Sequence, residues 1–242
     1  MLVLTLALTA CGEKKQARVR VPPPPTIQAS SAPSSNSTVA TPSSPAKPQP
    51  PKLDLPDNFK PLQVETGYAS WYGAPYHNRR GANGQLYDMN AYTAAHRTFP
   101  LNSIVRVTNI SSGATTMVTI TDRGPFVDNR IIDLSVAAAK AVGVWRPGTA
   151  KVRLEVLQSP SPLDRGGRWA VQMGGFDDEK EATKIKEKLA RRYHTAKVLE
   201  FSSPVGDWWV RVRVLDDDKR RAEEVAKNSP APPANTFLVR LD

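Results

Sequence analysis

The sequence contains one cysteine, three histidines and no long apolar run. A single cysteine, Cys11, excludes an intrachain disulfide, so each folded part must depend on its own hydrophobic core. No apolar stretch is long enough to predict a membrane-spanning helix. No group of His, Cys and Asp has the spacing of metal ligands, so we expect neither a metal nor another cofactor. A length of 242 residues allows one or two modest domains.

The excess of positive charge is distributed along the chain. The formal net charge is +10, and residues 67–157 contribute 10 Lys and Arg against 5 Asp and Glu. The segments on either side carry smaller excesses. A basic surface of this kind is either a solvated face or a site that recognises an anionic polymer, and charge alone leaves both possibilities open.

The first ten residues, MLVLTLALTA, are apolar and end in small residues just before Cys11. This pattern is typical of a secretory signal peptide, here 1–10. The segment Leu8-Thr9-Ala10-Cys11 resembles the lipobox of bacterial lipoproteins. That resemblance implies cleavage before Cys11 and lipidation of this residue; a buried N-terminal strand is the alternative. Gly12, where inner-membrane retention usually shows Asp, favours export to the outer membrane.

Residues 11–66 are rich in proline and serine and lack apolar periodicity. Residues 1–66 hold 12 of the 22 prolines. Such a segment buries too little apolar area to offset its ordering entropy, which predicts a disordered tether. Fully extended, it would reach on the order of 150 Å at about 3.1 Å per residue.

Residues 67–157 are predicted to be rich in β-strands. Short β-branched runs at 103–108 and 115–121 flank the loop 109–113, and 151–157 alternates polar and apolar residues. One helix is expected at 136–142, with Ser135 as its N-cap and Gly143 at its C′ position. Many short strands with one small helix predict a compact barrel.

The same segment carries a series of motifs. In order they are GYASWYG (67–73), ANG (82–84), YDM (87–89), TAAHRT (93–98), VRVTN (105–109), DRGPF (122–126) and IDLS (132–135). Together they resemble the rare lipoprotein A family over almost the whole segment. The resemblance implies a double-psi β-barrel. It also implies a lytic transglycosylase, a lyase that cuts peptidoglycan between N-acetylmuramic acid and N-acetylglucosamine and leaves a 1,6-anhydro end.

Carboxylates are scarce in this segment, which has Asp88, Asp122, Asp128, Asp133 and Glu155. Ordinary glycoside hydrolysis uses two cooperating carboxyl groups. A lytic transglycosylase can use one, because its nucleophile is the sugar's own 6-hydroxyl, already held near the anomeric carbon. The same carboxyl group can protonate the leaving oxygen and then deprotonate the attacking hydroxyl. Scarce carboxylates therefore favour transglycosylation over hydrolysis.

Asp122 is the expected catalytic acid and base, because it follows a predicted strand and opens the DRGP turn at a barrel rim. The alternative is an aspartate that only accepts hydrogen bonds from turn amides. A general acid needs a pKa raised by burial, and Arg123 would oppose this if its side chain faced Asp122. His96 matches the family histidine and is expected to contact the acid or the substrate, with a structural role as the alternative. Asp133 is expected at most to accept hydrogen bonds from the first turn of the following helix.

Substrate contacts are expected from Asn83, Gln85, Tyr87 and Arg123. Gln85 departs from the family pattern, since active members have Glu at this position. An amide can position a sugar hydroxyl but cannot transfer a proton. The alternative to an enzyme is therefore a non-catalytic protein that binds septal peptidoglycan.

Residues 167–242, after a linker at 158–166, predict the order β-α-β-β-α-β. The strands are expected at 168–173, 196–201, 208–214 and 236–241, and the helices at 179–193 and 217–227. The motifs WAVQMGGF (169–176) and WVRV (209–212) resemble the SPOR domain. That resemblance implies binding to glycan strands without stem peptides, which are concentrated at division septa. The expected contacts are Trp169, Gln172, Trp209 and Arg211, with burial in the core as the alternative for the tryptophans.

The sequence as a whole predicts an outer-membrane lipoprotein that faces the periplasm and is enriched at the division septum. Its expected partners are denuded peptidoglycan strands, the membrane through its lipid anchor, and proteins of the division machinery. Its expected role is cell wall remodelling and daughter-cell separation. The same β-α-β-β-α-β order occurs in RNA-binding domains, but the basic and aromatic pattern of those domains is missing, so we expect no nucleic acid.

Overall fold

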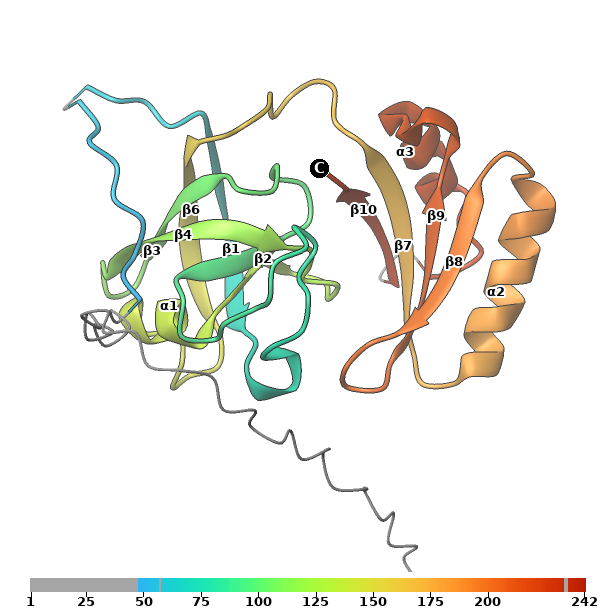
Figure 1. Ribbon diagram of the computed structural model, residues 1–242, viewed down its shortest axis with the longest axis horizontal. Helices are drawn as coiled ribbons and strands as arrows, with labels where there is room; N and C mark the ends of the chain where they lie inside the picture. Colours follow the sequence, from blue (N-terminus) through green and yellow to red (C-terminus); the bar gives the residue numbers. More distant parts are fainter. Residues whose placement is uncertain (1–47, 57, 233–234) are drawn as a thin grey trace, which may run out of the picture. The chain divides into compact units, whose positions relative to one another are not determined.

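A computed structural model describes residues 48–56, 58–232 and 235–242. These residues belong to one unit, which contains a closed barrel and a four-stranded sheet (Figure 1). The predicted signal peptide, Cys11 and most of the predicted tether lie outside the described residues. In the part of the chain that is described, no helix is both long and apolar enough to cross a membrane.

Six strands close into the barrel in the order β1-β5-β2-β4-β3-β6. They are β1 (Gln63–Trp71), β2 (Thr93–His96), β3 (Ile104–Asn109), β4 (Thr115–Asp122), β5 (Arg130–Leu134) and β6 (Ala150–Gln158). The pairs β1–β5 and β2–β4 are parallel, and the other pairs are antiparallel. The predicted barrel is confirmed. Residues 63–66, which we expected in the tether, instead belong to β1, because they pair with β6.

Alternating residues of the strands fill the barrel interior. On β3, β4 and β6 the residues with no exposed surface are Val105, Val107, Val118, Ile120, Val152, Leu154 and Val156. Burying each such side chain contributes roughly 1.5–3 kcal/mol. The β-branched alternation that predicted these strands is therefore the pattern of their buried face.

Helix α1 (Val136–Ala141) packs on the barrel core through Ala138 and Ala139. It has the expected N-cap, Ser135, and ends one residue earlier than expected, with Val142 as its C-cap. The Ser135 hydroxyl accepts a hydrogen bond from the amide of Ala138 at 3.2 Å and donates one to the carbonyl of Ala91 at 2.6 Å. Gly143 follows the helix with a φ of 72°, a left-handed conformation that favours glycine.

The C-terminal sheet has the antiparallel order β10-β7-β9-β8. Its strands are β7 (Trp169–Phe176), β8 (Lys197–Ser202), β9 (Trp208–Arg213) and β10 (Thr236–Arg240), and its helices are α2 (Glu179–Arg192) and α3 (Lys219–Lys227). The short 3-10 turns η1 (Ala74–Tyr76) and η2 (Leu215–Asp217) complete the elements. The predicted order is confirmed. Helix α3 begins two residues later than expected, because the Asp218 carboxylate caps it by accepting from the amide of Arg221 at 2.9 Å.

Both helices pack on one face of this sheet, in a core that contains Val171 and Val212 from the strands and Leu189 and Val225 from the helices. The opposite face of β7 and β9 carries Gln172, Trp209 and Arg211, because side chains alternate along each strand. The sheet therefore presents a polar and aromatic face away from its helices.

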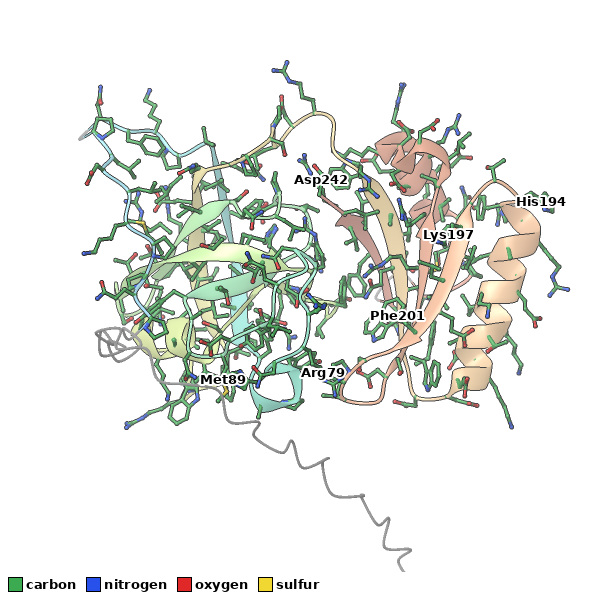
Figure 2. The ribbon with its side chains drawn as sticks, in the orientation of Figure 1. Arg79, Met89, His194, Lys197, Phe201 and Asp242 are labelled. Atoms are coloured by element: carbon green, nitrogen blue, oxygen red, sulfur yellow. The ribbon has the colours of Figure 1, made fainter. Side chains whose placement is uncertain are left out.

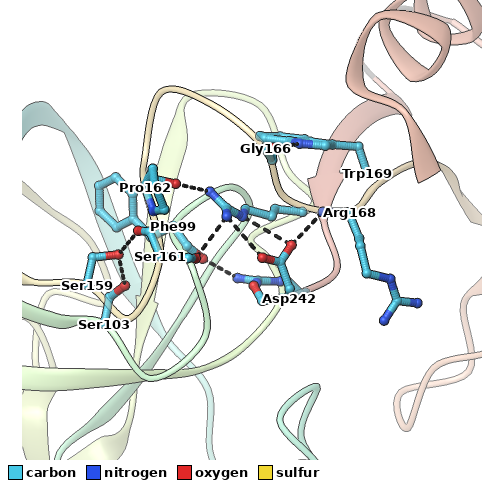
Figure 3. A network of polar contacts seen from close by, with 11 residues as sticks. Phe99, Ser103, Ser159, Ser161, Pro162, Gly166, Arg168, Trp169 and Asp242 are labelled. Atoms are coloured by element: carbon cyan, nitrogen blue, oxygen red, sulfur yellow. Dashed lines mark hydrogen bonds and ion pairs between the residues drawn. The ribbon is translucent and has the colours of Figure 1, made fainter. Parts of the chain in front are cut away.

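The end of β10 is held by a buried polar network (Figure 3). Arg240 has no exposed surface and donates to the carbonyl of Pro162 at 2.7 Å and to the hydroxyl of Ser161 at 3.0 Å. It also pairs with the Asp242 carboxylate at 3.0 Å. The backbone carbonyl of Asp242 in turn accepts from the amide of Leu101 at 3.0 Å. These bonds join the chain end to residues before β7 and to the barrel.

We predict that Ser135→Ala lowers the free energy of unfolding by about 1–3 kcal/mol, because it removes a helix cap and leaves the Ala91 carbonyl without its donor. Chemical denaturation monitored by circular dichroism measures the change. The exposed loop residue Ser111 supplies the matched control, and Ser111→Ala should change stability by less than about 0.5 kcal/mol. Equal stability of the two variants would contradict the role given to the Ser135 hydroxyl.

Candidate active site

A cleft of about 930 Å³ opens where β4 and β5 meet the loop 79–82. Its charged lining residues are Arg79, Arg80, Asp122, Arg123, Arg130, Asp133, Asp207 and Arg211. Figure 2 labels Arg79, which lines the cleft from the barrel, and Phe201, which lines it from β8. The cleft thus combines two partly buried carboxyl groups of the barrel with arginines of both the barrel and the sheet.

Asp122 ends β4 and lines the cleft, as expected of a residue at the barrel rim. Its Oδ1 accepts hydrogen bonds from the backbone amides of Arg123 at 2.8 Å and Ala82 at 3.0 Å. Burial raises the pKa of Asp122, and the two amides and the charges of Arg123 and Arg211 oppose this only in part. The turn-amide alternative is therefore present in the structure, but it engages only one carboxylate oxygen.

Asp133 lies on β5 and lines the same cleft. Its Oδ2 accepts from Arg130 at 3.0 Å, whereas its buried Oδ1 has no hydrogen-bond partner among the described residues. Burial raises the pKa of Asp133 to about 6 despite the nearby charges of Arg130 and Arg97. The expectation that Asp133 serves the first helical turn is wrong, because the Ser135 hydroxyl caps that turn.

His96 contacts Glu65 rather than Asp122. Its Nε2 lies 3.3 Å from the Glu65 carboxylate, and its Nδ1 accepts from the amides of Thr98 at 3.2 Å and Phe99 at 3.0 Å. The ring is 3% exposed and does not line the cleft. These contacts support the structural alternative for His96, which shapes the turn after β2. Glu65 is a further barrel carboxylate, outside the segment 67–157 in which we counted five.

Arg123 is 8% exposed, and its guanidinium binds backbone carbonyls. It donates to the carbonyls of His96 at 3.0 Å, Phe99 at 2.7 Å and Asp242 at 2.6 Å. Burial lowers the pKa of Arg123 to about 10. Its two terminal nitrogens thus donate to the backbone and not to the Asp122 carboxylate, while its buried Nε has no hydrogen-bond partner among the described residues. Arg123 also lines the cleft, and its contact with a substrate stays a prediction.

Asn83, Gln85 and Tyr87 surround a smaller hollow of about 120 Å³ that Asp122 also lines. The Asn83 amide donates to the Gln85 side-chain oxygen at 3.1 Å. A carboxylate at position 85 could accept the same bond. Tyr87 is 6% exposed, stacks on Tyr72 with ring centroids 4.3 Å apart, and donates to the carbonyl of Tyr72 at 2.7 Å. These three residues therefore share the lining of this hollow with Asp122, and their predicted contact with substrate stays a prediction.

The four predicted glycan contacts on the sheet are divided between its two faces. Trp169 is 3% exposed and packs in the core beneath the helices, so its predicted contact with glycan is wrong. Gln172 is also buried and accepts from the Arg211 Nε at 3.1 Å on the opposite face. Trp209 packs against Phe126, with centroids 5.3 Å apart, and both Trp209 and Arg211 line the cleft.

No three His, Cys, Asp or Glu side chains come together as a metal site within the described ranges. The residues that line the cleft supply carboxyl groups, arginines and aromatic rings. Among these, Asp133 and Arg130 were not expected at the site. The sequence feature that could have indicated Asp133 is the IDLS motif (132–135), which contains it.

Two family models match the chain. The lytic transglycolase model matches residues 64–154, which include the whole barrel except its first and last residues. The SPOR domain model matches residues 166–229, which include β7, β8, β9 and both helices. The barrel is thus a double-psi β-barrel of the lytic transglycolase class, followed by a SPOR domain.

Relatives of known name match more than half of the chain. The endolytic peptidoglycan transglycosylase RlpA of Neisseria meningitidis serogroup B is 39% identical over 181 residues, which cover 74% of this chain and 70% of the relative. The RlpA protein of Helicobacter pylori is 38% identical over 168 residues, and the chain spans 52% of its length. That of Campylobacter jejuni is 36% identical over 210 residues, covering 74% of this chain and 72% of the relative. The chain belongs to the RlpA family.

We predict that the His96 imidazole is neutral at pH 6.5 and carries its proton on Nε2, because Nδ1 accepts two amide hydrogen bonds. Burial also lowers the pKa of His96, although Glu65 opposes the shift. Nitrogen-15 NMR of the three labelled histidines distinguishes the tautomers. His77 and His194 provide internal references. A His96 ring that titrates at or above pH 6.5 would contradict the assignment.

Proposed function

We propose that this chain is a lytic transglycosylase that cleaves the bond between N-acetylmuramic acid and N-acetylglucosamine and leaves 1,6-anhydro ends. The observation that carries the proposal is the cleft that holds the Asp122 carboxyl, with a pKa raised by burial, on a double-psi β-barrel of the lytic transglycolase class. The relatives in Neisseria meningitidis and Helicobacter pylori are named for the same activity.

Asp122 has the properties that proton transfer in this reaction requires. One of its oxygens is held by two backbone amides, which fixes the orientation of the carboxyl group. Oriented groups act on a bound sugar with a large effective concentration. The nucleophile is the 6-hydroxyl of the same muramic acid residue, so the site does not need to bind and activate a water molecule. Asp122 accepts the proton that this hydroxyl loses as it attacks the anomeric carbon.

The arginines of the cleft support a preference for glycan without stem peptides. Removal of a stem peptide by an amidase leaves a free lactyl carboxylate on each muramic acid, so a denuded strand is an anionic polymer. Arg79, Arg130 and Arg211 line the cleft and can pair with such carboxylates. The SPOR domain, whose sheet places Arg211 in the lining, is the part of the chain that would hold the strand.

Lipidation of Cys11, anchoring in the outer membrane on its periplasmic side, and enrichment at the division septum complete the proposal. They are supported by the lipobox-like segment before Cys11 and by the SPOR domain. Proteins of the division machinery are the partners that such a location would bring. In this setting the enzyme would act in cell wall remodelling and daughter-cell separation.

We predict that the wild-type chain releases 1,6-anhydro ends from denuded glycan and that Asp122→Asn reduces the rate by about 10²–10⁴-fold, because an amide cannot accept the proton. Mass spectrometry of the released glycans measures both. Gln85→Glu should raise the rate, by up to roughly 10²–10³-fold if a carboxylate there stabilises charge in the transition state. The exposed Asp128 and Gln158 supply matched controls, and Asp128→Asn and Gln158→Glu should leave the rate unchanged.

Two outcomes would argue against this assignment in different ways. Activity that survives Asp122→Asn would mean that another group accepts the proton. A wild type without anhydro product, together with product from Gln85→Glu, would favour the alternative of a non-catalytic protein that binds septal peptidoglycan.

We also predict that Arg211→Ala weakens retention of the full chain on amidase-treated sacculi by about tenfold, because it removes a charge-assisted contact with the lactyl carboxylates. A co-sedimentation titration measures retention. Arg191, on the outer surface of α2, is 78% exposed at its side chain, and Arg191→Ala is the matched control. Equal retention of both variants, or of wild type on treated and untreated sacculi, would refute this mode of recognition.

A further inference from the structure

Asp122 and Asp133 lie in one row across three neighbouring barrel strands. Ala95 on β2 pairs with Asp122 on β4 and with Asp133 on β5. Adjacent strands lie about 4.8 Å apart, so the two aspartate Cα atoms are separated by about 10 Å. Residues paired directly across strands present their side chains on the same face of a sheet. All three residues line the cleft.

A register shift in β4 brings Asp122 into this row. The preceding row pairs Ala94 with Ile120 and Leu134, and all three are fully buried in the barrel core. Regular alternation would send Asp122 to the same face as Ile120. The shift between Ala94 and Ala95 places Asp122, instead of Thr121, opposite Ala95. Irregularities of this kind redirect side chains beside functional sites.

Small residues leave the space between the two carboxyl groups open. Ala95, between them in the row, has only a methyl side chain. Gly124 lies beside it and has no side chain; a Cβ atom at position 124 would lie 3.8 Å from the Ala95 Cβ, an ordinary van der Waals distance. A sugar residue can therefore approach the row from the cleft with one carboxyl group on either side.

The surroundings of the two carboxyl groups differ. Asp122 accepts two amide hydrogen bonds on Oδ1, and such bonds favour the ionised form. Asp133 has a single partner, Arg130 on Oδ2, and its buried Oδ1 lacks one within the described part of the chain. A proton carried on that oxygen has no acceptor among the described residues. Because Oδ1 itself is buried, the carboxyl group of Asp133 must turn toward the cleft that this residue lines before a bound substrate can take the proton.

We propose that Asp133 is a second catalytic residue, which donates the proton to the leaving glycosidic oxygen while Asp122 accepts the proton of the attacking 6-hydroxyl. The C1–O4 bond breaks and the leaving N-acetylglucosamine takes the Asp133 proton on O4. The C1–O6 bond forms and O6 gives its proton to Asp122. Exchange with water then returns the proton from Asp122 to solvent and restores that of Asp133.

The pKa of Asp133 is consistent with its role as the proton donor. The charged and titratable groups around it are Arg130 on β5, Arg97 after β2, Tyr72 after β1 and Tyr76 in η1. Burial outweighs the two arginines and raises the pKa to about 6. Because a raised pKa keeps the proton bound up to that pH, the acid is present below about pH 6 and is lost above it. The rate should therefore fall as the pH rises through this range.

The test of this assignment, which rests on the proposed transglycosylase activity, uses two substrates and the full chain. One substrate is denuded glycan. The other is a denuded glycan fragment in which a 4-nitrophenyl group replaces the leaving N-acetylglucosamine, so that the phenolate departs without a proton. Asp133→Asn should reduce the rate on denuded glycan by about 10²–10⁴-fold but on the nitrophenyl substrate by less than about tenfold. Asp122→Asn should be slow on both, because the 6-hydroxyl must still lose its proton.

A purely structural role for Asp133 would make Asp133→Asn equally slow on both substrates, and that result would overturn the assignment even if the variant is less stable. Full activity of Asp133→Asn on denuded glycan would overturn it as well. Asp128→Asn, a carboxylate outside the cleft, should match wild type on both substrates. A wild type that forms no anhydro product from either substrate would instead refute the proposed activity itself.

Discussion

The pairing of β2 with β4 on one side and β5 on the other determines what the cleft contains. Strand β2 has only four residues, yet its pairing places one row in the barrel core and the next row in the cleft. Ala94 belongs to the first row and Ala95 to the second. Because successive side chains of β2 point to opposite faces, slipping its register by one residue would exchange core and cleft. The apolar core therefore fixes the position of the two aspartates.

The turn after β2 depends on a second set of interactions, which are polar. His96 accepts amide hydrogen bonds within the turn, and Arg123 donates to the carbonyls of His96 and Phe99. The same guanidinium also donates to the carbonyl of Asp242. Leaving any of these buried groups without a partner would cost about 1–3 kcal/mol. His96 and Arg123, for which the motifs predict roles in catalysis and binding, thus hold the backbone beside Asp122.

The sequence predicted elements whose pattern is local. Local patterns predicted the β-branched strands β3, β4 and β6 and the capped helix α1. They also predicted the order of strands and helices in the C-terminal sheet. Strand β2, with the residues Thr93–His96, is too short and too rich in alanine to show alternation, and β1 begins with the half-polar segment 63–66. Glu65 was missed for that reason. Trp169 could have been assigned correctly, because it alternates with Val171 and Met173, whereas the polar Gln172 marks the other face.

The role of Asp133 could not be inferred from its position before a helix, because Ser135 supplies the cap and tertiary pairing turns Asp133 toward the cleft.

The placement of Asp133 in the cleft bears on the substitution at Gln85. If the barrel offered only Asp122, the loss of a carboxylate at position 85 would leave one group to act as both acid and base. With Asp133 in the same row, the cleft holds two carboxyl groups. Burial raises the pKa of both, but only Asp122 accepts two amide hydrogen bonds, which favour its ionised form. A difference of this kind between two carboxyl groups can separate acid from base. Gln85 lies beside Asp122 in the smaller hollow, where its amide can still bind a sugar hydroxyl. On this view the substitution alters how substrate and charge are held near Asp122 and leaves the proton transfers to the two aspartates.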